Sequence, residues 1–85
     1  MNTETIKQKV HQFISDNTFS NADDIADDTM IFREGYLDSM GFITLITFLE
    51  DTFNVKTDDR DFVEENFESV NAICAYVQQK LTVNA

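Results

Sequence analysis

The sequence contains no proline or tryptophan, and among its 85 residues there are only two glycines and one cysteine. Without proline the helices can run on uninterrupted, and turn pairs such as Asn-Gly, which mark tight hairpins, are absent. The lone Cys74 has no partner for an internal disulfide, which is typical of a protein in a reducing compartment. These absences favour a helical protein of the cytoplasm.

Basic residues are also scarce, because six Lys and Arg stand against 16 Asp and Glu, which gives a net charge of −10. Phosphate backbones and anionic lipid surfaces would repel such a chain, so we expect it to bind no nucleic acid and to enter no membrane. No stretch is long enough and apolar enough to span a bilayer. The acidity suits either attraction to basic patches on partner proteins or simply the solubility of a small domain.

Apolar residues recur with helical spacing in three segments of the chain. The predicted helices cover residues 3–17, 39–53 and 69–81. Asn2 or Thr3 is suited to cap the first helix, and Ser69 is suited to cap the last. With 42% hydrophobic residues, a chain of 85 residues can bury one core, so we expect a single domain, 1–85, that is a monomer.

Between the second and the last of these helices we predict a short helix, capped by Asp58 or Asp59. Its buried anchors are expected to be Phe62, Val63 and Phe67.

The connection 18–38 shows no clear period but contains apolar residues, so we expect an ordered crossover with one helical turn near 23–26. The predicted fold class is therefore all-α. It is a small four-helix bundle of three main helices and one short helix, with a long first crossover.

Catalytic motifs are weak in this sequence. Ser39-Met40-Gly41 supplies half of a Gly-x-Ser-x-Gly nucleophile elbow, but Leu37 stands in place of the first glycine and no strand precedes it. The only histidine, His11, is expected at the surface. A catalytic triad needs a base within hydrogen-bond reach of the serine, and one lone histidine is weak evidence for such a base. We therefore expect no catalytic residues, and a protein that is not an enzyme.

Acidic residues cluster at 23–28 and at 58–61, but neither cluster has the spacing or the glycine of a calcium-binding EF-hand loop. Cys74 lies on an apolar helical stripe with no other Cys or His nearby, and is expected to be a buried structural thiol. We expect no metal site.

Ser39 stands where the second predicted helix begins and has two interpretations. Either Ser39 is the N-cap, for which serine is favoured, or Asp38 is the cap and Ser39 lies in the first turn. In the second case its hydroxyl points outward at the positive end of the helix dipole, where free N–H groups favour an attached phosphate. Composition alone favours the capping role.

The segment Leu37-Asp38-Ser39-Met40, followed by an apolar helix that ends Phe48-Leu49-Glu50-Asp51-Thr52-Phe53, resembles the phosphopantetheine-dependent acyl carrier proteins. The residues from Asp28 to Gly35 also resemble the family's approach to its serine. The resemblance covers nearly the whole chain: a leading helix, a long crossover, Asp-Ser at the second helix, a short third helix and a final helix.

This resemblance implies that Ser39 receives 4′-phosphopantetheine from coenzyme A through a holo-synthase, which is a phosphopantetheinyl transferase. The thiol of this arm would hold an acyl or aminoacyl group as a thioester, while the protein itself catalyses nothing. Other implied partners are the ligase that loads the arm and downstream synthase or transferase enzymes with basic patches. The expected partner-recognition residues lie on and beside the second helix: Asp38, Met40, Ile43, Thr47, Glu50 and Asp51. The short helix around 61–67 would close one side of the arm's exit.

Two features depart from the fatty-acid type of carrier. Gly41 stands where such carriers usually have a second acid, and Thr44 and Thr47 make the second helix less acidic. We therefore expect a carrier of a specialised fatty-acid or polyketide-type pathway, with an aminoacyl carrier of the D-alanyl type as the alternative. A further alternative is an acidic helical interaction module that carries nothing. If Gly41 lies in a regular first turn, alanine there should stabilise the protein by up to roughly 1 kcal/mol.

Overall fold

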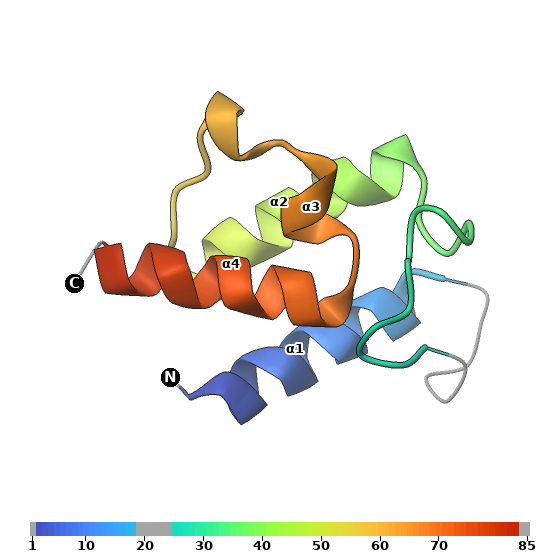
Figure 1. The fold of residues 1–85 in the computed structure, drawn as a ribbon, viewed down its shortest axis with the longest axis horizontal. Coiled ribbons are helices and arrows are strands. Elements are labelled where there is room, and N and C mark those ends of the chain that lie inside the picture. Colours follow the sequence, from blue (N-terminus) through green and yellow to red (C-terminus); the bar gives the residue numbers. More distant parts are fainter. Residues whose placement is uncertain (1, 19–24, 84–85) are drawn as a thin grey trace.

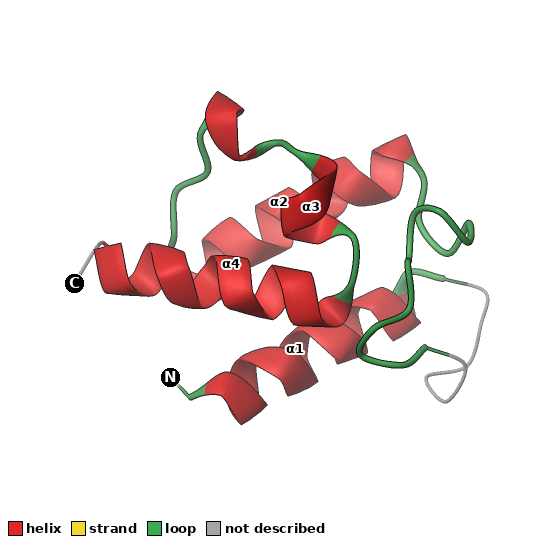
Figure 2. Cartoon of the chain, in the orientation of Figure 1, coloured by secondary structure: helices red, strands yellow, loops and turns green. Residues whose placement is uncertain are grey.

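The computed structural model describes residues 2–18 and 25–83 (Figure 1). These residues form helices and loops, and no strand occurs among them (Figure 2). The elements are α1 (Thr3–Asp16), α2 (Ser39–Phe53), the 3₁₀ turn η2 (Asp59–Asp61), α3 (Glu64–Phe67) and α4 (Val70–Val83). The predicted all-α bundle of three main helices and a short one is confirmed.

The helix α4 is central to the packing, since it contacts α1, α3 and α2. It runs antiparallel to α1, and both lie alongside α2 in Figure 1. The apolar stripes predicted from the spacing meet in one core. Its most deeply buried members on the three long helices are Ile6, Val10, Ile14, Leu45, Leu49, Val70, Ile73 and Val77.

Side-chain caps define where the long helices begin. The Asn2 Oδ1 accepts the Thr5 N–H at 2.8 Å, and the Ser69 Oγ accepts the Ala72 N–H at 3.1 Å, so both predicted caps are confirmed. At the other end of α2, Asn54 adopts a left-handed conformation (φ 55°), a common way to end a helix. The bounds of α2 agree with the predicted 39–53, whereas those of α1 and α4 differ from the prediction by one or two residues, as helix ends usually do.

The crossover is ordered over its described part, as predicted. Ile25, Ile31 and Leu37 are buried in the core. The Ile31 N–H donates to the Glu68 carbonyl at 2.9 Å, which ties the crossover to the residues just before α4. The helical turn expected near 23–26 falls partly outside the described residues, and residues 25 and 26 are not helical.

His11 is not the surface residue that we expected from its place beside the apolar stripe. It is half-buried, and its Nε2 lies 2.6 Å from the Ile25 carbonyl oxygen. The returning crossover covers this side of α1, where Lys7 Nζ also lies 3.4 Å from Asp27 Oδ2. Local periodicity could not reveal this, because the crossover residues are distant in sequence.

Cys74 is buried, and its Sγ lies 3.7 Å from the Thr3 carbonyl oxygen. Burial raises the pKa of the Cys74 thiol, so the group stays protonated and unreactive. The prediction of a buried structural thiol is confirmed.

The segment predicted as one short helix before α4 contains the short helix α3, preceded by the separate 3₁₀ turn η2. Asp58 caps η2 by accepting the Arg60 N–H at 3.1 Å, while Asp61 Oδ2 accepts the Asp58 N–H at 3.0 Å. This reciprocal capping box fixes the start of η2, which ends after three residues with Phe62 as its C-cap. The second turn, α3, follows after a break at Phe62 and Val63.

Only one of the three predicted anchors of this segment is buried. Phe67 lies in the core, but Phe62 is 44% exposed and Val63 is 47% exposed, so the prediction for these two was wrong. They stand at the break between η2 and α3, where Val63 is extended (φ −115°, ψ 146°) and no longer follows a helical face.

Replacing Ile31 with alanine should lower the free energy of unfolding by about 3 kcal/mol, because its buried side chain fixes the crossover to the core. The matched control is Ile43→Ala, which removes a side chain that is 59% exposed and should cost less than about 0.5 kcal/mol. Urea unfolding followed by circular dichroism measures both. Equal losses in the two variants would contradict the anchoring role of Ile31.

Candidate functional site

Asp38, and not Ser39, is the N-cap of α2. The Asp38 Oδ1 accepts the Gly41 N–H at 2.9 Å, and the Asp38 carbonyl accepts the Phe42 N–H at 2.9 Å. Ser39 is therefore the first helical residue, and its side chain is exposed. Of the two interpretations that the sequence left open, the structure supports the one in which the serine hydroxyl is not used for capping.

A compact turn in front of α2 sets the position of Asp38. The N–H groups of Tyr36 and Leu37 both donate to the Ile31 carbonyl, at 2.8 and 3.1 Å. The chain reverses through Gly35, whose φ of 83° lies in the left-handed region that glycine adopts without strain. The Leu37 side chain is buried beneath the turn, so the start of α2 is fixed to the core.

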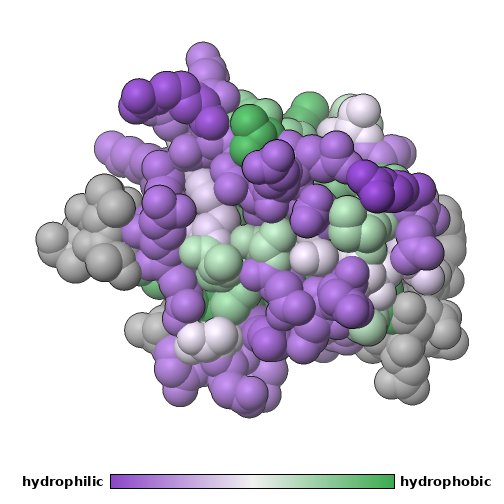
Figure 3. Space-filling model, in the orientation of Figure 1, coloured by the Kyte–Doolittle hydropathy of each residue, from purple (hydrophilic) through white to green (hydrophobic). Residues whose placement is uncertain are grey.

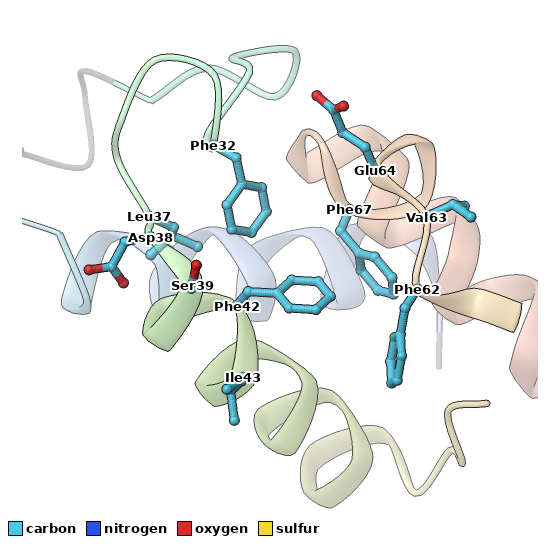
Figure 4. A pocket seen from close by; sticks show the side chains of 10 residues that line it. All are labelled: Phe32, Leu37, Asp38, Ser39, Phe42, Ile43, Phe62, Val63, Glu64 and Phe67. Atoms are coloured by element: carbon cyan, nitrogen blue, oxygen red, sulfur yellow. The ribbon is translucent and has the colours of Figure 1, made fainter. Parts of the chain in front are cut away.

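An apolar groove with a volume of about 540 Å³ opens beside Ser39. Figure 4 shows the rings of Phe32, Phe42 and Phe67 turned toward one another, with Ser39 at the edge. The ring of Phe42 meets Phe32 at 5.7 Å and Phe67 at 5.4 Å between centroids, in edge-on geometries that aromatic pairs favour. The remaining lining residues are Leu37, Asp38, Ile43, Phe62, Val63 and Glu64.

The electrostatics at Ser39 favour a negatively charged group. The first N–H groups of an α-helix have no partner within the helix, and they lie at the positive end of its dipole. The first turn of α2 contains no acid, so only the capping Asp38 places a carboxylate there. A phosphate joined to the Ser39 oxygen would lie where these N–H groups stabilise it.

Four of the six expected partner-recognition residues are freely exposed on α2. Met40 is 70% and Ile43 59% exposed, and Thr47 and Asp51 are also exposed. The Thr47 hydroxyl donates to the Ile43 carbonyl at 3.2 Å, so it stays close to its own helix. Asp38 is exposed too, although one of its oxygens is used in the cap.

Glu50, the remaining expected docking acid, has a structural partner. Its Oε2 accepts the Thr57 hydroxyl at 2.6 Å and the Thr57 N–H at 3.1 Å. These hydrogen bonds hold the pKa of the Glu50 carboxyl below its ordinary value, the hydroxyl contributing most. The half-buried carboxylate thus fastens the loop after α2.

The described residues, 2–18 and 25–83, contain no group of three His, Cys, Asp or Glu side chains arranged to hold a metal ion. Asp58 and Asp61 are used in the cap of η2, and Asp61 also contacts Tyr76 and Lys80 of α4. Within the same part of the chain, no helix has the length and apolar content needed to cross a membrane.

Sequence reasoning missed the aromatic wall of the groove. The sequence analysis predicts Phe62, Val63 and Phe67 as buried anchors of one short helix and assigns no such role to Phe32 or Phe42. One signal was available: Asp58 and Asp61 have the spacing of a capping box, which marks Asp58 as the start of a separate helical turn.

Comparison with known proteins identifies the class. The family model for the phosphopantetheine attachment site matches residues 8–77, and the chain belongs to this family of phosphopantetheine-dependent carrier proteins. The chain therefore carries a covalently attached 4′-phosphopantetheine, and the alternative of an interaction module that carries nothing is set aside. The exposed serine hydroxyl at a helix N-terminus, beside an apolar groove, fits such a group.

Within this class, the curated relatives are D-alanyl carrier proteins. The protein of that name from Lactococcus lactis subsp. cremoris (strain MG1363) is 33% identical over 81 residues, which cover 93% of this chain and 100% of the relative. The one from Lacticaseibacillus casei (strain BL23) is 33% identical over 79 residues, covering 93% and 98%. The one from Streptococcus uberis (strain ATCC BAA-854 / 0140J) is 31% identical over 75 residues, covering 88% and 94%.

The structure reverses the expectation for Gly41. A Cβ added there would lie 3.0 Å from Leu37 Cδ2 and 3.3 Å from Leu37 Cβ, closer than ordinary contact. Leu37 cannot move away easily, because it is buried and its N–H is bonded to the Ile31 carbonyl. Glycine is favoured at position 41 because the helix backbone lies close to the Leu37 side chain, and not because of an unusual φ.

We expect Gly41→Ala to lower the free energy of unfolding by about 1 kcal/mol, because the strain exceeds the gain in helix propensity. Thr44→Ala, three residues later on an exposed face of α2, should instead raise it by about 0.5 kcal/mol. Urea denaturation of the unmodified proteins measures both changes. Stabilisation by alanine at both positions would contradict the close contact with Leu37.

Proposed function

We propose that Ser39 is the attachment point of the phosphopantetheine arm and that the protein is a non-catalytic carrier. The observation that carries this proposal is the capping role of Asp38, which leaves the neighbouring hydroxyl exposed at the start of α2. The chain presents the hydroxyl, and a separate phosphopantetheinyl transferase performs the chemistry.

In the attachment step the Ser39 oxygen attacks the β-phosphorus of coenzyme A. A phosphodiester bond to the serine forms, the bond within the pyrophosphate breaks, and adenosine 3′,5′-bisphosphate leaves. The hydroxyl proton passes to a base of the transferase. The N–H groups at the start of α2 stabilise the negative phosphodiester next to them. The arm, once bound, supplies a thiol that holds its cargo as a thioester.

The exposed face of α2 is the proposed recognition surface for the transferase, the loading ligase and the downstream enzymes. Met40 and Ile43 offer large apolar side chains within one turn of Ser39. Thr47 and Asp51 continue the exposed surface along α2, and Asp38 adds a carboxylate at its start. Glu50 contributes its charge there while it also holds Thr57.

The net charge of −10 favours partners with basic patches, because opposite charges steer association. The face in Figure 3 is largely hydrophilic, with apolar surface in smaller patches. A surface of this kind suits brief encounters with several enzymes in turn rather than one permanent interface. The protein acts as a single carrier domain in the cytoplasm, where its free thiol Cys74 is stable.

The cargo that we propose is an aminoacyl group of the D-alanyl type. The names of three relatives that align over most of the chain support this cargo. It replaces our first expectation of a specialised fatty-acid or polyketide-type pathway, which none of these names supports.

Incubation with coenzyme A and a broad-specificity phosphopantetheinyl transferase should add one arm to the wild-type protein, seen by intact-mass spectrometry. Ser39→Ala should gain no mass, since the attacking oxygen is gone. The control Thr44→Ala, which removes another exposed hydroxyl of α2, should be modified as fully as the wild type. An arm that persists in Ser39→Ala would place the attachment elsewhere.

The modified protein should accept D-alanine from ATP and a D-alanine-activating carrier-protein ligase, gaining the mass of one alanyl group. Hydroxylamine should remove that mass, because the link is a thioester. A parallel reaction with a fatty-acid ligase and a long-chain acid should give little product. Efficient fatty acylation without alanylation would favour the acyl pathway instead.

A further inference from the structure

Phe62 and Val63 form an exposed apolar pair in an acidic part of the surface. Asp58 and Asp59 precede them, and Glu64 and Glu65 follow, all with exposed side chains. Together with Met40 and Ile43 they are the large hydrophobic residues most exposed in the described chain. Large apolar side chains held in solvent often mark a place where another protein binds.

Asp61, the residue before Phe62, is fastened to α4 by its side chain. Its Oδ2 accepts the Tyr76 hydroxyl at 2.9 Å and lies 2.8 Å from Lys80 Nζ. Only about a fifth of the Asp61 and Lys80 side-chain surface is exposed (23% and 21%), so water screens this pair less than an open surface pair. We call Asp61, Tyr76 and Lys80 the clasp.

The main chain of Asp61 fixes the residues that follow. Its carbonyl accepts the Val63 N–H at 2.8 Å and the Asn66 side-chain amide at 2.8 Å. The backbone of Phe62 therefore lies between two residues that are held by hydrogen bonds. Its ring rests edge-on against Phe42, with 6.0 Å between centroids.

The clasp also connects to the floor of the groove through Tyr76. The Tyr76 ring meets Phe67 edge-on at 4.9 Å between centroids, and Phe67 in turn contacts Phe42. One buried tyrosine thus supports both the loop that bears Phe62 and the aromatic floor beside Ser39. The hydrogen bond from Lys80, and then that from Tyr76, holds the pKa of the Asp61 carboxyl below its ordinary value.

We propose that Asp61 is a positioning residue, and that the clasp holds Phe62 and Val63 outward as an apolar docking point for the phosphopantetheinyl transferase that acts at Ser39. The inference rests on the proposed function, because it assumes that partners approach this serine. Phe62, Val63 and Ser39 line the same groove, in which Phe62 and Val63 stand on the opposite side from Ser39 (Figure 4). A partner would thus meet the carrier on two sides of the arm.

The chemistry of the docking point defines the partner surface that fits it. The apolar pair is flanked in the sequence by four exposed acids. Two exposed bases lie beside them, Arg60 at 3.5 Å from Asp58 and Arg33 at 3.7 Å from Glu64, so acids still outnumber bases there. The complementary surface is an apolar patch rimmed by Lys or Arg side chains, so that burial supplies affinity and charge supplies orientation. Rigid display of Phe62 and Val63 reduces the conformational entropy lost on docking.

The first test removes the docking point. The double variant Phe62→Ala/Val63→Ala should raise the KM for the carrier about tenfold in phosphopantetheinyl transfer from coenzyme A, a loss typical of an apolar anchor. Its kcat should stay near the wild-type value, because Ser39 and its cap are untouched. The free energy of unfolding in urea should fall less than in Ile31→Ala, since neither side chain is buried. An unchanged KM would overturn the docking point.

The second test loosens the clasp from α4. Lys80→Met and Tyr76→Phe should each raise the KM about threefold, with Lys56→Met as the control for loss of an exposed lysine charge. Amide hydrogen exchange at Val63 should accelerate while that at Ile6, in α1, keeps its rate. Acceleration throughout the chain would show that the clasp serves only global stability.

A double-mutant cycle separates positioning from a general effect. In the Phe62→Ala/Val63→Ala background, Lys80→Met should raise the KM no further, because the clasp acts through the two missing side chains. A further threefold rise in the KM would contradict the proposal that the clasp acts through Phe62 and Val63. If the wild-type protein accepts no arm at all, the proposed function fails, whereas modification with unchanged KM values sinks only this inference.

Discussion

The site depends on one hydrogen bond, that from the Gly41 N–H to the Asp38 carboxylate. Because aspartate occupies the capping position, α2 begins at Ser39 and the serine oxygen is left without a structural task. Had Ser39 been the cap, its hydroxyl would have been occupied by a backbone N–H and turned toward the helix. The choice of cap therefore decides whether a phosphoryl group can be attached there.

That hydrogen bond is held in place by the end of the crossover. Leu37 is buried directly under the first turn, and the absence of a side chain at Gly41 lets the helix approach it. The Leu37 N–H donates to the Ile31 carbonyl, and the Ile31 N–H donates to the carbonyl of Glu68, just before α4. The described end of the crossover thus fixes the position of Ser39 relative to the bundle.

Much of this arrangement could be predicted from local patterns, because periodicity and caps are short-range signals. The helix 39–53 and the caps Asn2 and Ser69 followed from spacing and residue type. The partial burial of His11 and the exposure of Phe62 could not be predicted in the same way. His11 is covered by a segment distant in sequence, and Phe62 is exposed because a capping box and a clasp to α4 outweigh its preference for the core.

Figure 1 shows the beginning of α1 and the end of α4 at one end of the molecule, while α2 begins at the other. A surface or a fused tag joined through either terminus would therefore hold the bundle by the pole remote from its serine. The end at which α2 begins would face the solution and stay accessible to partner enzymes. For a carrier that must meet one enzyme after another, this arrangement means that attachment through a terminus leaves the serine accessible.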